Sequence, residues 1–143
     1  MAKKVSGSII TIGLWLALLG GPALAQNANA SPDARALIER QLDAFAHDDA
    51  GAAYAIAAPG IKQIFPDAGV FLSMVRERYA PVYHHRSVEF GEAKVGADEI
   101  EQTATFVDDD GQVWKALYKL ARQPDGQWLI TGCALIKSDD KAA

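Results

Sequence analysis

Cysteine is almost absent from this sequence. Cys133 is the only one among 143 residues, so the chain cannot form a disulfide with itself. Small exported domains that rely on disulfides carry several pairs of cysteines. The fold must therefore rest on a hydrophobic core, and a chain of this length is long enough to build one.

Clustered positive charge is also missing. The chain has 14 Lys and Arg against 18 Asp and Glu, a formal net charge of −4, and no stretch gathers the basic residues. An acidic surface repels phosphate backbones. We therefore expect no nucleic-acid partner.

The sequence also lacks residues spaced as the ligands of a metal site. His84 and His85 are neighbours, so in an extended segment they point in opposite directions, and His47 falls on the polar side of a predicted helix. The acidic run 108–110 lacks the spaced ligands and the closing Glu of a calcium loop, and is better explained as a solvated turn. We expect no metal and no cofactor.

The N-terminus has the pattern of a cleavable secretory signal. Lys3 and Lys4 precede an uncharged apolar run over 5–21, and Ala23 and Ala25 form the small-residue cleavage pattern. The alternative, a retained membrane anchor, is disfavoured because the run is shorter than the ~20 residues needed to span a bilayer. Position 26 is Gln rather than the cysteine of a lipoprotein, and no twin-Arg pair precedes the run.

Cleavage after Ala25 implies a periplasmic or secreted product that no longer associates with the membrane. Loss of residues 1–25 removes two lysines and no acids, so the product has 12 basic and 18 acidic residues and a net charge of −6. We expect residues 26–30 to be a flexible start, 31–138 to form one domain, and 139–143 to be a disordered tail.

The first half of that domain is predicted to be helical. Ser31, Pro32 and Asp33 are typical of a helix start, and apolar positions at helical spacing continue to about residue 47, with Gln41 as a polar exception among them. Shorter helices are expected over about 49–57, 61–65 and 67–78. The segment 79–86 is expected to be a connector.

From residue 87 the apolar period changes to two, which predicts strands near 87–95, 99–107, 113–122 and 127–137. The sequences 109–111 and 124–126 are typical of three-residue hairpin loops that end in a left-handed glycine. The fold class is therefore α+β, with N-terminal helices packed on a C-terminal four-stranded antiparallel meander.

The hairpin loops fix a register that sorts the strand residues into two faces. Gln102, Trp114, Tyr118 and Trp128 fall on a mainly apolar face that should lie under the helices. Glu101 falls opposite Lys119, and Tyr118 falls opposite Gly132 on that same scheme. The register places Cys133 opposite Leu117 on the other, mixed face.

Motifs along the whole mature chain resemble a bacterial family of small exported proteins known as domain of unknown function 4864. They are Gln41 to Phe45, Asp49, Tyr54, Ala58-Pro59-x-Ile61, Phe65, Phe71, Met74-Val75-x-x-x-Tyr79, Asp110-Gly111, Tyr118, Pro124-Asp125-Gly126-x-Trp128 and Gly132-Cys133. The family has no established activity to carry over. Its element order is similar to the cone-like architecture of cystatin and SnoaL, the nuclear-transport-factor-2-like fold, which serves enzymes, binders and dimerisation modules alike.

That resemblance implies a cavity between sheet and helices. We expect Gln41, Gln102, Trp114, Tyr118 and Trp128 to line it, with the polar groups of Gln41, Gln102 and Tyr118 either satisfying one another or facing a ligand. The two tryptophans are better explained as core aromatics than as a platform on which a ligand stacks.

Two functions follow from this arrangement. The first is non-catalytic binding of a small apolar ligand or a protein partner. The second is an isomerase or hydrolase that uses a pocket carboxylate, for which Glu89, Glu92 and Asp43 are the candidates because the other strands offer none.

Cys133 has two interpretations. On the mixed face with Leu117 and flanking lysines it would belong to a homodimer interface and could form an intersubunit disulfide. Alternatively it is a buried thiol that only fills space, as free cysteines commonly are.

Overall fold

The computed structural model describes residues 30–142. The predicted signal segment 1–25 and the predicted flexible start, apart from Ala30, lie outside this range. The helices come first and are α1 (Pro32–Ala46), α2 (Ala50–Ala55), α3 (Pro59–Ile64), α4 (Ala68–Arg78) and α5 (Ala80–Tyr83). The strands follow as β1 (Ser87–Val95), β2 (Glu99–Val107), β3 (Gln112–Arg122) and β4 (Trp128–Lys141).

Three of the helices begin at capping residues that the sequence predicts. The Ser31 side chain accepts from the Ala34 amide, Asp49 from the Ala52 amide, and Asp67 from the amides at 69 and 70. These caps satisfy amides that have no partner inside the helix. The predicted connector 79–86 contains the additional short helix α5, in which Pro81 occupies the first turn, where a proline is tolerated.

The strands form one antiparallel sheet in the order β1-β2-β3-β4, which confirms the predicted meander. Both hairpin loops end as expected, because Gly111 and Gly126 adopt φ values of 78° and 86°. Between β2 and β3 the predicted register is confirmed along the full length, including Glu101 opposite Lys119, whose charged atoms are 3.8 Å apart.

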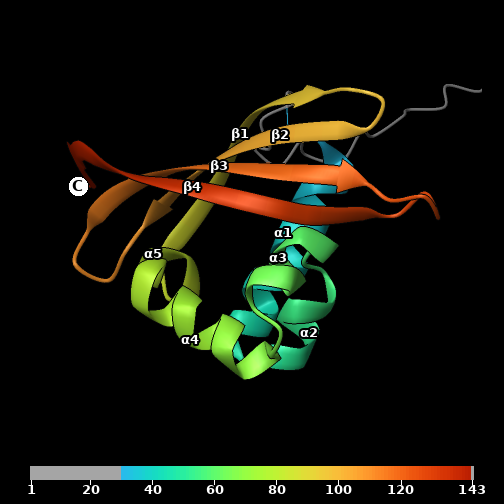
Figure 1. Ribbon diagram of the computed structural model, residues 1–143. Helices are drawn as coiled ribbons and strands as arrows, with labels where there is room; N and C mark the ends of the chain where they lie inside the picture. Colours follow the sequence, from blue (N-terminus) through green and yellow to red (C-terminus); the bar gives the residue numbers. More distant parts are fainter. Residues whose placement is uncertain (1–29, 143) are drawn as a thin grey trace, which may run out of the picture.

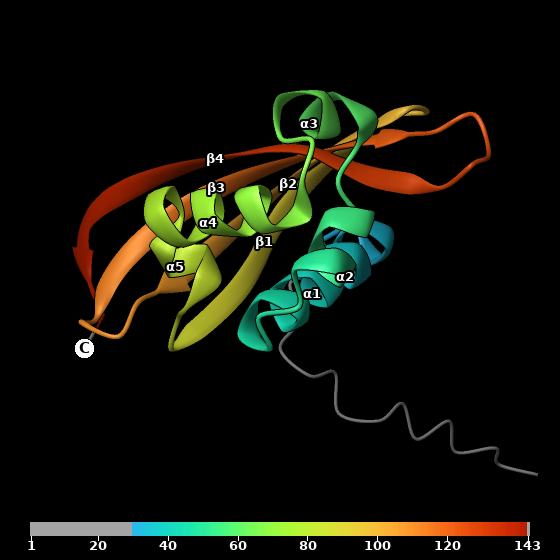
Figure 2. The same cartoon turned by 60° about the horizontal axis from the view of Figure 1, so that its bottom comes forward.

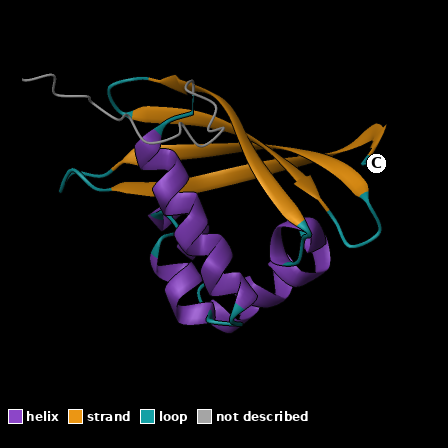
Figure 3. Cartoon of the chain, turned by 180° about the vertical axis from the view of Figure 1, so that it is seen from behind, coloured by secondary structure: helices purple, strands orange, loops and turns teal. Residues whose placement is uncertain are grey.

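All the helices lie on one face of the sheet, so the α+β class and its two layers are confirmed (Figure 1). Figure 3 shows the same two layers from behind, with α1 crossing beneath the strands. In Figure 2 α1 lies beside α2 and α4 beside α5, while α3 lies above β4. Helices α2 and α4 are also in contact, through Tyr54 and Phe71. The core between the layers includes Phe45, Phe106 and Ile38, each at most 2% exposed.

The register between β3 and β4 departs from the prediction at a β-bulge. Leu120 pairs with Ile130 as expected, but Lys119 then pairs with Gly132, which leaves Thr131 as an extra residue on β4. One extra residue exchanges the two faces of a strand from that point on. Cys133 therefore lies opposite Tyr118 on the helix-covered face, and the predicted pairings of Tyr118 with Gly132 and of Cys133 with Leu117 are wrong.

The exchange of faces also affects the residues of β4 that follow Cys133. Ala134 now pairs with Leu117 on the outer face, and Ile136, expected in the core, is 66% exposed. The segment after α2 pairs with β4 at the bulge, where the Ala58 amide donates to the Ile130 carbonyl and the Ile130 amide donates to the Ile56 carbonyl. These bonds use the backbone groups of Ile130 that face away from β3. At Ile130, just before the bulge, β4 is therefore bonded to the segment after α2 on one side and paired with β3 on the other.

The predicted tail at 139–143 is in part a strand, because β4 continues to Lys141. The Gln112 side-chain amide anchors this extension by donating to the Ser138 carbonyl at 2.6 Å. The sequence there is polar and charged, so its composition does not reveal a strand. Within residues 30–142, no helix is long and apolar enough to cross a bilayer.

Candidate functional site

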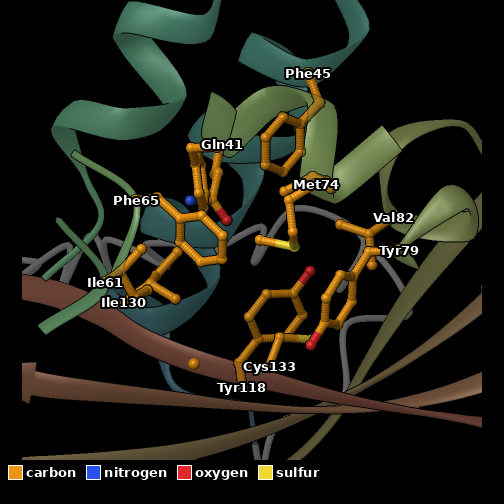
Figure 4. Close-up of a pocket in the computed structure, with 13 residues that line it drawn as sticks. Gln41, Phe45, Ile61, Phe65, Met74, Tyr79, Val82, Tyr118, Ile130 and Cys133 are labelled. Atoms are coloured by element: carbon orange, nitrogen blue, oxygen red, sulfur yellow. The ribbon is translucent and has the colours of Figure 1, made fainter. Parts of the chain in front are cut away.

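A cavity of about 150 Å³ lies between the sheet and the helices. Its floor is formed by strand residues, namely Tyr118 of β3 and Ile130, Gly132 and Cys133 of β4. Its walls are aromatic and aliphatic side chains from the helices and their ends, which include Phe45, Ile61, Phe65, Phe71, Met74 and Val82. Figure 4 shows these side chains converging from both layers.

An aromatic cluster shapes the helical wall. The Phe71 ring lies 5.8 Å from the Tyr54 ring, 6.1 Å from the Phe65 ring and 6.3 Å from the Phe45 ring, all tilted as aromatic pairs prefer. The Tyr54 hydroxyl donates to the Phe65 carbonyl at 2.6 Å. This bond ties the end of α3 to α2, and so holds Phe65 against the cavity.

Gln41 reaches the cavity from α1, as the sequence predicts. It is 4% exposed, and its amide nitrogen donates to the Ala53 carbonyl at 3.3 Å. That bond fixes which end of the amide is the donor. The amide oxygen points toward the open space of the cavity (Figure 4).

Gln102 lies directly opposite Tyr118 in the sheet but does not line the cavity. It is fully buried, and its amide is occupied by backbone. Its oxygen accepts from the Ser31 amide at 2.9 Å, and its nitrogen donates to the Gly91 and Thr103 carbonyls, each at 2.8 Å. Gln102 is thus a structural clamp between α1, β1 and β2.

The two tryptophans also lie away from the cavity. The Trp114 indole nitrogen donates to the Asp108 carboxylate at 2.9 Å, which lowers the pKa of that acid. Trp128 lies under the Arg122 guanidinium and borders a separate, more open hollow beside Leu37 and Ile56. Of the five predicted pocket residues, the structure therefore brings Gln41 and Tyr118 together and places the other three elsewhere.

Tyr118 is the unusual polar group of the site. It is 1% exposed, and its hydroxyl has no hydrogen-bond partner among the described residues. Figure 4 shows this hydroxyl rising from the sheet into the cavity toward Met74. Burial raises the pKa of the phenol well above its ordinary value, so it stays protonated and available as a donor.

Cys133 lies beside Tyr118 on the cavity floor. Burial raises the pKa of its thiol to about 12. The two side chains are close enough to influence each other's ionisation, but the phenol and the thiol do not meet the geometry of a hydrogen bond. The premise that Cys133 shares an outer face with Leu117 is wrong, and a homodimer through that face stays an untested prediction.

The candidate carboxylates do not reach the cavity. Glu89 pairs with Thr105 on the outer face, Glu92 is exposed at a bulge in β1, and Asp43 is exposed on α1 beside His47. Within residues 30–142, no three His, Cys, Asp or Glu side chains come together as a metal site would require. His84 contacts Asp109 at 3.8 Å, whereas His85 packs edge-on against the Phe106 ring.

Fold and site together define a small α+β domain with an apolar cavity between its helices and its sheet. The family model described as "Domain of unknown function (DUF4864)" matches residues 27–143, so the chain belongs to this family. A comparison with curated proteins finds no significant match.

The structure adds several cavity residues that sequence reasoning missed, notably Phe65, Met74 and Cys133. The first two sit at helical positions that look like ordinary core. Sequence alternation places Cys133 on the wrong face because the bulge at Thr131 has no strong sequence signal. A glycine after a threonine in a strand is the available hint, since strand glycines often mark bulges.

Proposed function

We propose that this domain binds a small apolar molecule in the cavity and performs no reaction on it. The observation that best supports this proposal is the lining, in which aromatic and aliphatic side chains surround about 150 Å³ of space and few polar atoms interrupt them. A dry apolar cavity of roughly that volume is large enough to hold a benzene-sized molecule. Ligand sites in proteins are typically apolar with a few placed polar groups.

The catalytic alternative has less support. Proton transfer on a substrate requires a carboxylate or imidazole within hydrogen-bond reach. The cavity lining consists of Gln, Gly, Cys, Met, Tyr and hydrocarbon side chains, and Glu89, Glu92 and Asp43 all lie elsewhere. The thiol of Cys133 is held in its protonated form, which is a poor nucleophile.

Ligand-induced stabilisation tests the proposal. We expect millimolar benzene to raise the Tm of the protein, because a ligand that binds only the folded state stabilises it by mass action. Met74→Trp, which fills the cavity, should abolish that rise, and the matched control Met74→Leu, which keeps the volume, should retain it. An equal rise in all three proteins would show that benzene acts outside the cavity and would refute the proposal.

We also propose that the domain is exported to the periplasm or the medium after cleavage following Ala25. The basic start, the apolar run and the alanines support this, and the family match begins only two residues beyond the proposed cleavage point. Intact mass of the exported protein should correspond to a chain beginning at Gln26. Recovery of the full-length chain in the membrane fraction would contradict it.

A further inference from the structure

Within residues 30–142, the hydroxyl of Tyr118 is a donor without a partner in a mainly apolar space. A buried polar group left unpaired costs about 1–3 kcal/mol, so folded proteins rarely keep one. No described side chain bonds this hydroxyl, although the Gln41 amide oxygen and the Tyr79 hydroxyl also line the cavity. The Gln102 amide is fully used by backbone groups, and the Gln41 nitrogen is used by the Ala53 carbonyl.

The Tyr118 hydroxyl is placed so that a molecule bound in the cavity could accept a hydrogen bond from it. Tyr118 stands on the cavity floor on β3, the strand between β2 and β4, and its oxygen points into the space that Met74 faces from α4 (Figure 4). A molecule in the cavity would therefore meet this hydroxyl before it meets any other polar atom of β3. One oxygen on that molecule suffices to satisfy it.

The charge of the surroundings limits the ligand further. Among the described residues, the lining contains no ammonium, guanidinium or imidazole group that could neutralise an anion. Lys62 and Arg76, which belong to α3 and α4, lie over the rings of Tyr54 and Tyr83. An unpaired charge in an apolar cavity carries a large desolvation penalty.

We infer that the ligand is a neutral, ring-sized apolar molecule that carries a hydroxyl or carbonyl oxygen, and that this oxygen accepts a hydrogen bond from Tyr118. This inference rests on the proposed function and specifies the ligand class. We assign the polar specificity of the cavity to this hydroxyl, because it is buried and has no partner among the described residues. The Gln41 amide and the Tyr79 hydroxyl are the other polar side-chain groups that line the cavity beside the Cys133 thiol, and the remaining lining selects for size and apolarity. Carboxylate-bearing molecules of the same size are excluded by the missing cation.

Calorimetric titration of the purified protein at pH 7 with benzene, phenol and benzoate tests the inference. Phenol and benzene have similar shapes but differ by the oxygen, and benzoate carries a charge. In Tyr118→Phe we expect the affinity for phenol to fall about tenfold, as the loss of one good hydrogen bond implies, while that for benzene changes by less than about twofold. Benzoate should bind neither protein. Cyclohexanone has an oxygen that can accept a hydrogen bond but no hydroxyl that can donate one. Its affinity should fall in Tyr118→Phe as much as that of phenol does, because the inferred bond needs only an acceptor on the ligand.

A second readout does not depend on the variant. The ¹³C shift of the Tyr118 Cζ atom should move when phenol is added to the wild type and should move much less with benzene. Equal losses for benzene and phenol in Tyr118→Phe, or tight binding of benzoate, would overturn the inference while the proposed function stands. If neither benzene nor phenol binds the wild type, the proposed function fails and the inference falls with it.

Discussion

Tyr118 of β3 and Cys133 of β4 are direct cross-strand neighbours whose side chains share the floor of the cavity. The pairing exists only because β4 gains one residue at Thr131, whose hydroxyl donates to the Lys119 carbonyl at 3.1 Å and closes the bulge. A strand without the bulge would place Gly132 beside Tyr118 and turn the thiol to the outside. The polarity of the cavity floor is thus set by backbone irregularity as much as by residue type.

Removing the hydroxyl of Tyr118 should stabilise the ligand-free protein. Tyr118→Phe deletes a buried polar atom that has no partner among the described residues, so we expect the free energy of unfolding to rise by about 1 kcal/mol in urea titrations. Tyr54→Phe is the matched control, since it breaks the 2.6 Å bond to the Phe65 carbonyl and should lower stability by about the same amount. Equal destabilisation by both variants would show that Tyr118 is already bonded.

Gln102 should be far more important for stability than Gln41. Gln102→Leu leaves the Ser31 amide and two carbonyls without their partner, so we expect a loss of about 3 kcal/mol in the free energy of unfolding. Gln41→Leu removes a single long bond and should lose about 1 kcal/mol or less. Urea titrations that rank the two variants in the opposite order would contradict the clamp assigned to Gln102.

The thiol of Cys133 should be unreactive in the native protein. Because burial raises its pKa to about 12, almost no thiolate exists at pH 8, and a disulfide reagent should react orders of magnitude more slowly than with a free thiol. Full reaction in guanidinium serves as the control. Rapid native labelling, or a disulfide-linked dimer on a non-reducing gel, would instead favour an exposed Cys133.

Two histidines should give opposite pH dependences. Burial lowers the pKa of His85, so its contribution to stability is present above its unfolded pKa near 6.5 and is lost as pH falls through its lower folded value. The Asp43 backbone carbonyl and carboxylate raise the pKa of His47, so its contribution is present below 6.5 and is lost as pH rises. Urea titrations at pH 5.5 and 8 should show that His85→Gln reduces the loss of stability in acid, whereas His47→Gln increases it. Parallel behaviour of the two variants would refute this assignment.

The helices, hairpins and most of the sheet register are predictable from local signals. Capping residues mark the helix starts, and the glycine turn at 109–111 fixes the pairing of β2 with β3. The bulge is not predictable by hydrophobicity, because Cys133 and Leu135 are as apolar as Ala134 and Ile136. When both faces of a strand have similar character, alternation cannot decide which set points inward.

The site was partly predictable for a related reason. Gln41 stands out as a polar residue on an apolar helix face, and Tyr118 as a polar residue in a buried strand. The partners of Gln102 could not be anticipated, since the Ser31 amide and the Gly91 carbonyl are distant in sequence and Gly91 lies in the bulge of β1. At that bulge a methyl group on Gly91 would lie 2.6 Å from the Thr103 hydroxyl oxygen, so the glycine has a steric role that no local pattern reveals.

The bond between the Ser31 amide and the Gln102 side chain leads us to expect a particular order of assembly. It joins positions 71 residues apart, at the very start of α1 and the middle of β2. Helix α1 can wind locally within microseconds, but its first turn gains this anchor only after β1 and β2 have paired. We therefore expect α1, the first element of the described residues, to be anchored late, and amide hydrogen exchange during refolding to show protection at the centre of the sheet before the N-terminal turn of α1.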